Sequence, residues 1–157
     1  MIGYLIFAVV WVALDQGVKF LVRAAIPLHT SQTFIPGLFD LTYIRNTGAA
    51  FSILRSQTWL LTVLSGVAVV VLLVLLLRRA IPSKLGMLSL SLLLAGAAGN
   101  FIDRLAFGYV TDMFETTFMN FPVFNVADMF VTCGAVLSFL LYVRWEKKRE
   151  QEEVARV

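Results

Sequence analysis

The chain has 157 residues, of which 59% are hydrophobic and 15% are charged, and its mean hydropathy is +0.84. This composition excludes an ordinary soluble domain, because such a chain lacks the polar surface that covers a globule in water. The net charge is only +3 and the basic residues form no dense patch, which argues against nucleic-acid binding. One His and one Cys, His29 and Cys133, cannot supply the three or four ligands of a conventional zinc site.

Four apolar stretches are long enough to cross a membrane as helices, since about 20 residues span the hydrocarbon core. These spans are predicted at about residues 3–25, 58–77, 85–104 and 124–143. In the first span, Asp15 and Lys19 are four residues apart, so they share one helix face and can pair. Because charged groups are costly in lipid, this face is expected to look into the protein. Pro27 should end the helix.

Residues 28–56 differ from the spans because Ser, Thr, Gln, Pro and Gly are mixed with apolar side chains. The segment 39–45 alternates between polar and apolar residues with a period near two, which predicts a strand. Ile35-Pro36-Gly37 is a turn pattern before it. We therefore expect a short β-rich element that rests on the membrane surface. The lone Cys133, within the last span, is expected to be a small buried residue.

The basic residues predict the orientation in the membrane. Arg78, Arg79 and Lys84 lie between the second and third spans, and four more basic residues begin the tail, residues 144–157. The positive-inside rule places both segments in the cytoplasm. Both termini are then cytoplasmic, and residues 28–56 and 105–123 are extracytoplasmic. The charged tail is expected to be solvated and prone to form a helix. The whole chain, 1–157, is predicted to be a single membrane domain.

Residues 99–128 contain most of the acidic side chains that precede the tail: Asp103, Asp112, Glu115 and Asp128. Carboxylates near hydrocarbon are costly and therefore point to a functional site. If two aspartates meet, one stays protonated as a general acid while the other stays ionised as a base toward water. That is the chemistry of aspartyl peptide hydrolysis, and the sequence contains no motif of a serine peptidase, a zinc peptidase or a P-loop.

The spacing does not decide which aspartates react. Asn100, Asp103 and Arg104 share one helix face, so Asp103 fits an ion pair with Arg104 as well as a catalytic role. Asn125 precedes Asp128 by three residues, so that each of the two aspartates has an amide on its own face. The pair of Asp15 and Lys19 is compatible with a structural role or with orienting a substrate. Glu115 fits the rim of a site, and Asp40 fits a solvated strand.

Two other functions are compatible with membrane carboxylates. A small transporter or proton-coupled channel would place acids at mid-membrane on several spans and would show internal symmetry, whereas Asp103, Asp112 and Asp128 gather at one edge. A scaffold that binds lipid or partner helices would tolerate Asp→Asn at both Asp112 and Asp128. A scaffold gives no reason for two Asn-x-x-Asp pairs that face the same side.

Five motifs occur in the order of a known family: Asp15-Gln16 with Lys19, Asn-Thr-Gly-Ala-Ala-Phe at 46–51, Gly99-Asn100 with Asp103-Arg104, Asp112, and Phe-Asn-Val-Ala-Asp at 124–128. Together they resemble the lipoprotein signal peptidase family, or signal peptidase II, of bacterial inner membranes. The resemblance runs from the first span to the last. Each motif alone is weak, but five in order with four spans are specific.

The resemblance implies a membrane all-α protein of four transmembrane helices with a small extracytoplasmic β-cradle and a short interfacial helix. It implies an aspartyl endopeptidase that cleaves prolipoproteins just before a cysteine bearing diacylglyceryl and is blocked by globomycin-type inhibitors. Aspartyl chemistry needs no cofactor or metal, and we expect the chain to act as a monomer. By position, the catalytic pair falls on Asp112 and Asp128. The supporting residues fall on Asp15, Lys19, Asn46, Asn100, Asp103, Arg104 and Asn125.

One departure from the family pattern is Glu115, where a second aspartate is expected near Asp112. The charge is kept, so the rim contacts are affected more than the dyad. The aromatic segment 105–123 is expected to lie at the interface and to close over bound lipid and peptide.

Overall fold

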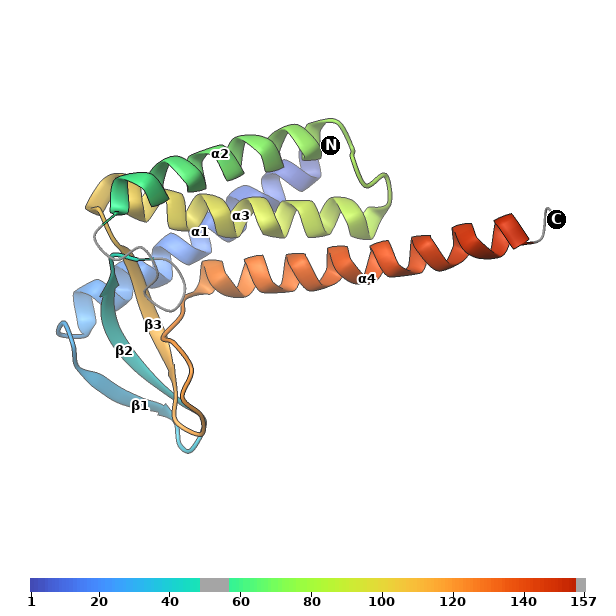
Figure 1. Cartoon of the computed structure of the whole chain (residues 1–157). Helices are drawn as coiled ribbons and strands as arrows, with labels where there is room; N and C mark the ends of the chain where they lie inside the picture. The colour runs from blue at the N-terminus through green and yellow to red at the C-terminus, as the bar shows by residue number, and fades with distance from the viewer. Residues whose placement is uncertain (49–56, 155–157) are drawn as a thin grey trace.

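A computed structural model describes residues 1–48 and 57–154, which form four long helices and one small sheet (Figure 1). The helices are α1 (Ile2–Ala25), α2 (Thr58–Leu77), α3 (Lys84–Phe107) and α4 (Val126–Val154). The strands are β1 (Ser31–Ile35), β2 (Phe39–Asn46) and β3 (Val110–Thr116). Within the described residues, four helices are long and apolar enough to cross a membrane.

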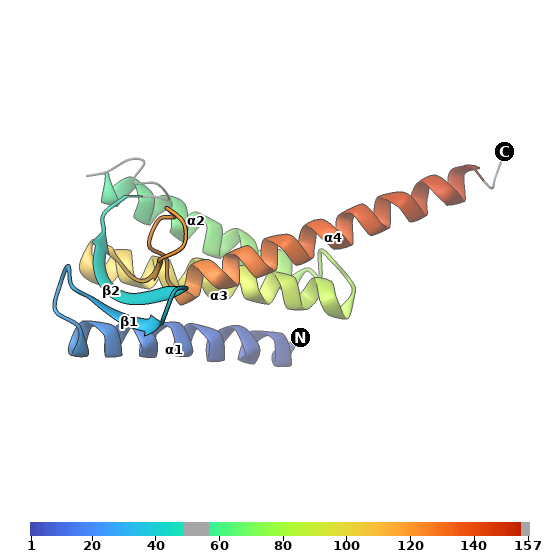
Figure 2. The ribbon, with the colours of Figure 1, turned by 90° about the horizontal axis from the view of Figure 1, so that it is seen from below.

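Helix α3 is the centre of the bundle and packs against the other three helices (Figures 1 and 2). Small residues allow this close approach, as is common between membrane helices. An added Cβ at Gly99 would lie 2.5 Å from Asp15 Oδ2 of α1 and 3.2 Å from Ala127 Cβ of α4. A side chain larger than hydrogen therefore cannot be added at Gly99 without displacing the Asp15 carboxylate or a neighbouring helix.

The sheet is antiparallel, with the strand order β1-β2-β3. Helix α3 ends at Gly108, whose φ of 73° is left-handed and turns the chain into β3. A register shift between Leu41 and Ile44 lies next to the pairing of Ile44 with Asp112. Such a bulge re-aims side chains. Tyr43 and Met113 pack against Val22 of α1 and against Ile26 just after it, which holds the sheet at one end of the bundle.

Most predicted elements are confirmed by the structure. The four helices occupy the predicted apolar stretches, and β2 covers the segment predicted as a strand. Helix α4 is longer than its predicted span and continues through the charged tail to Val154, which confirms the helix-prone tail. The first helix ends at Ala25, just before Pro27 as expected.

Three expectations differ from the structure. The segment 105–123, for which the sequence predicts no strand, contains the strand β3. Cys133 is exposed on α4 rather than buried. The described residues 1–48 and 57–154 contain no short helix besides the four long ones. Residues 49–51 of the Asn-Thr-Gly-Ala-Ala-Phe motif lie outside the described residues.

Candidate active site

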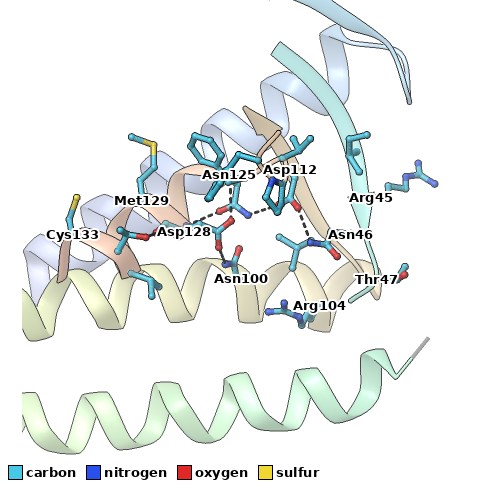
Figure 3. A pocket seen from close by; sticks show the side chains of 18 of the residues that line it. Arg45, Asn46, Thr47, Asn100, Arg104, Asp112, Asn125, Asp128, Met129 and Cys133 are labelled. Carbon is cyan, nitrogen blue, oxygen red and sulfur yellow. Dashed lines mark hydrogen bonds between the residues drawn. The ribbon is translucent and has the colours of Figure 1, made fainter. Parts of the chain in front are cut away.

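Two aspartates from different elements line one partly open cavity of about 970 Å³ (Figure 3). Asp112 comes from β3, and Asp128 comes from the first turn of α4. One wall of the cavity is polar and includes Asn46, Asn100 and Arg104. The other wall is apolar and is built from the loop before α4 and from α4 itself: Phe121, Pro122, Val123, Phe124, Met129 and Val131.

The Asp112 carboxylate is 3% exposed and accepts a hydrogen bond on each oxygen. Asn125 Nδ2 donates to Oδ1 at 2.7 Å, and Asn46 Nδ2 donates to Oδ2 at 2.9 Å. Burial and the nearby charge of Asp128 raise the pKa of Asp112 from 3.8 to about 7, against the lowering effect of the two amides. Asp112 can therefore hold a proton near neutral pH.

The Asp128 carboxylate sits at the start of α4, where Asn125 caps the helix. Asn125 Oδ1 accepts from Asp128 N at 3.0 Å, and Asp128 Oδ2 accepts from Asn125 N at 3.2 Å. This reciprocal pair is a capping box. The N-terminus of a helix also favours a negative charge. The second oxygen, Oδ1, accepts from Asn100 Nδ2 at 2.8 Å.

Three asparagine amides are held so that their donors face the aspartates (Figure 3). The amide oxygen of Asn46 accepts from Gly48 N at 2.9 Å. The amide oxygen of Asn100 accepts from Lys19 Nζ at 3.0 Å. The amide oxygen of Asn125 is occupied by the helix cap. Because an amide oxygen cannot donate, these contacts fix the direction of each side chain. The four oxygens of the two carboxylates thereby each accept one hydrogen bond.

A fully buried charge cluster, which does not line the cavity, supports this arrangement of amides. Lys19 Nζ lies 3.0 Å from Asp15 Oδ2 and 3.5 Å from Asp103 Oδ2, and all three side chains are 0% exposed. Asp15 Oδ1 accepts from Ala127 N of α4 at 2.9 Å. Asp103 Oδ2 accepts from Thr111 N, next to Asp112, at 2.8 Å. The predicted pair of Asp15 and Lys19 is confirmed, and it ties α1, α3, β3 and α4 together.

Asp103 and Arg104 do not pair as expected. Asp103 lies in the buried cluster with Lys19 and lies 3.8 Å from Arg23 Nη1, and it does not line the cavity. Arg104 lines the cavity instead, where its Nη2 donates to Gly48 O at 3.5 Å. Asn100 shares a helix face with Asp103, as expected, but it donates to Asp128 rather than to Asp103. Glu115 bonds Ser31 and lies outside the cavity lining.

Sequence reasoning missed some of the supporting groups. Gln16 Nε2 donates to Gly99 O at 3.0 Å and to Asp103 Oδ1 at 3.2 Å, which adds a second link between α1 and α3. Arg23 Nη1 donates a hydrogen bond to the Thr111 hydroxyl at 2.9 Å. Gln16 could have been found, because a Gln beside Asp15 in an apolar span needs partners inside the protein. Thr111 carried no such signal.

Paired carboxylates in a cavity of a protein with four membrane-length helices define an aspartyl peptidase embedded in a membrane. The comparison with known families specifies which one. The family described as "Signal peptidase (SPase) II" matches residues 7–144. The chain belongs to the signal peptidase II family, and it is a bacterial multi-pass membrane enzyme.

Individual relatives agree with this assignment. The chain is 40% identical over 151 residues to a lipoprotein signal peptidase of Enterococcus faecalis, which covers 96% of this chain and 94% of the relative. It is 41% identical over 147 residues to a lipoprotein signal peptidase of Latilactobacillus sakei, covering 94% and 97%. A solved bacterial membrane enzyme superposes with a TM-score of 0.86 at 30% identity, covering 92% of this chain and 89% of that one.

Proposed function

We propose that this enzyme removes the signal peptides of prolipoproteins by hydrolysing the amide bond just before a cysteine that carries diacylglyceryl. The family and the name of the relatives, lipoprotein signal peptidase, support this substrate. The single observation that carries the proposal is the pairing of Asp112 and Asp128 in a cavity with one polar and one apolar wall. The polar wall suits the scissile amide, and the apolar wall suits the lipid and the hydrophobic signal peptide.

In the proposed mechanism, the reactive dyad carries one proton, held by Asp112. Ionised Asp128 takes a proton from water as the water oxygen attacks the carbonyl carbon, and Asp112 gives its proton to the carbonyl oxygen. Asp128 then passes its proton to the amide nitrogen as the carbon–nitrogen bond breaks. The second hydroxyl of the tetrahedral carbon returns a proton to Asp112, which restores the starting state.

The supporting residues have distinct roles in this proposal. Asn46, Asn100 and Asn125 orient the two carboxylates through the hydrogen bonds they donate. Lys19, with its buried partners Asp15 and Asp103, holds Asn100 and the frame around the dyad. Arg104 lines the cavity within electrostatic reach of both aspartates and stabilises negative charge on the substrate.

We place the cavity near the outer face of the bacterial plasma membrane, with both termini in the cytoplasm. The positive-inside rule supports this orientation, because the α2–α3 turn, with Arg78 and Arg79, and the charged end of α4 lie at the end of the bundle opposite the sheet (Figure 1). A lipid-anchored precursor in the outer leaflet then meets the dyad at its own depth, where water is available. Membrane lipids and globomycin-type inhibitors are further proposed partners, and one copy of the chain is proposed to suffice.

The experiment that tests the substrate compares two forms of one precursor in proteoliposomes. The first precursor carries diacylglyceryl on the cysteine after the scissile bond, and the second has the same peptide with an unmodified cysteine. The proposal predicts cleavage of the lipidated form at the bond before the cysteine and at least about a tenfold lower kcat/KM for the other, equivalent to about 1.4 kcal/mol. Equal cleavage of both forms, or cleavage at another bond, would refute it.

A further inference from the structure

The end of the sheet where β3 ends carries an apolar surface that lies mostly outside the cavity. We call it the sheet tip; it consists of Phe34, Ile35, Leu38, Phe118, Met119 and Phe121, each between 40% and 59% exposed. The two loops that form it meet through a hydrogen bond from Thr117 N to Leu38 O at 3.0 Å. The ring centroids of Phe39 and Phe118 lie 6.3 Å apart, so the two loops form one continuous surface.

No charged residue interrupts this surface. Residues 34–39 and 116–127 contain no Asp, Glu, Lys or Arg. The first charged residues along the two strands are Asp40 and Glu115, which pair opposite each other behind the sheet tip. Exposed apolar patches of this kind mark contacts with a protein or a membrane. Aromatic and methionine side chains without charge suit the region where headgroups meet acyl chains.

The position of the sheet tip favours the membrane. In Figures 1 and 2 the sheet slants back along the bundle, so that its tip is level with the start of α4. The outer ends of α1 and α3 extend farther than the tip in both views. The tip therefore lies beside the bundle, at a depth that the apolar helices occupy, rather than above the bundle in water.

We propose that the sheet tip inserts into the lipid leaflet on the cavity side and forms a membrane anchor in addition to the four helices. A substrate in the cavity does not cover this surface, because Phe121 is the only one of the six residues that lines the cavity. The same loop that carries Phe118 forms the apolar cavity wall at Pro122 and Phe124. The anchor thus fixes the height of that wall relative to the leaflet. This inference rests on the membrane-spanning helices and does not depend on the proposed cleavage.

The test measures the environment of single labels in vesicles. Cys133, the only cysteine, is replaced in a Cys133→Ser background, and Phe34→Cys or Phe118→Cys is added and labelled with the environment-sensitive fluorophore NBD. Thr30→Cys is the matched control, because it is exposed and lies just before β1, at the end that follows α1. Each variant is used only if its melting temperature in detergent matches that of the background, and Met119→Cys replaces a variant that fails.

In phosphatidylglycerol–phosphatidylcholine vesicles, the proposal predicts blue-shifted emission at positions 34 and 118 and at least about a twofold loss of intensity when nitroxide-labelled lipid is included. The label at position 30 should fluoresce as in water and be quenched less. Water-like emission at both tip positions would overturn the proposal. Blue-shifted emission without quenching by the nitroxide lipid would overturn it too, because the tip would then be covered by protein, for example by a second copy.

Discussion

Asn125 connects both aspartates, and two substitutions at this position separate its functions. Asn125→Ser keeps a side chain that caps helices as well as Asn does, but a serine hydroxyl is too short to reach Asp112 in place of the amide. Asn125→Ala removes both the cap and the 2.7 Å hydrogen bond to Asp112 Oδ1. Serine thus isolates the contact with the dyad, and alanine adds the loss of the helix cap.

The expected shift in the pKa of Asp112 follows from the strength of the hydrogen bond that is lost. A hydrogen bond to a charged group contributes about 1.5–3 kcal/mol, and one pH unit of pKa corresponds to about 1.4 kcal/mol. The Asn125 amide stabilises the ionised form of Asp112 and lowers its pKa. Removing it should raise the pKa of Asp112, already about 7, by roughly 1–2. Asp112 then keeps its proton to higher pH, so the alkaline limb of the cleavage profile should move upward by the same amount.

The assay is the pH dependence of kcat/KM from about pH 5 to 10, with thermal unfolding measured in the same detergent. Both variants should show the upward shift of the alkaline limb. Below pH 7, where Asp112 keeps its proton, Asn125→Ala should lose about 1 kcal/mol more stability than Asn125→Ser, from the missing cap. A wild-type alkaline limb in Asn125→Ser would refute the assignment of Asp112 as the proton holder. A stability loss in Asn125→Ser equal to that in Asn125→Ala would show that the cap was not preserved and would remove the basis of the comparison.

Three further predictions concern stability. The folded state keeps the Asp112 proton between pH 3.8 and about 7. As the pH rises through this range, wild-type stability should therefore fall by ~4 kcal/mol relative to Asp112→Asn, and pH–stability curves that run parallel for the two proteins would contradict this. Lys19→Met leaves the buried carboxylates of Asp15 and Asp103 without their cation and should lower the free energy of unfolding by about 3–5 kcal/mol. Lys148→Met is the control: it removes an exposed pair, 3.6 Å from Glu152, and should lower it by under about 1 kcal/mol. Equal melting temperatures of the two variants would refute the role of the buried cluster. Gly99→Ala places a methyl group 2.5 Å from Asp15 Oδ2 and should destabilise the protein by about 1–3 kcal/mol. Gly17→Ala, where an added Cβ meets nothing within 4 Å, should not destabilise it. A Gly99→Ala variant as stable as the wild type would contradict the close approach of the helices.

Local patterns in the sequence predict the elements whose structure is determined locally. The helices follow from apolar stretches near 20 residues, and β2 follows from the alternation of residues 39–45. Strand β3 was not predicted because its partner, β2, precedes it by two helices in the chain. Its aromatic residues suit a membrane interface, but they do not by themselves indicate a strand.

The composition of the site follows from the sequence more readily than its pairings do. Helix periodicity correctly puts Asn100 and Asp103 on one face. It does not reveal that Asp103 pairs with Lys19, or that the Asn100 amide donates to Asp128. Those partners depend on where α1 and α4 pack against α3. The same packing separates Asp103, buried away from the cavity, from Asp112, which lines it. Spacing alone could not choose between these two carboxylates.

The most direct test of the account is the cleavage of a diacylglyceryl-modified prolipoprotein by Asp112→Asn and Asp128→Asn. Asn keeps the shape of each side chain and removes its acid–base function, which is worth about 10²–10⁴-fold in rate. The account predicts that both variants fold, that Asp112→Asn melts at or above the wild-type temperature at neutral pH, and that each variant loses at least about 100-fold in kcat. Cleavage by either folded variant at near the wild-type rate would contradict the assignment of the dyad, and Asp103 would then be the next carboxylate to substitute.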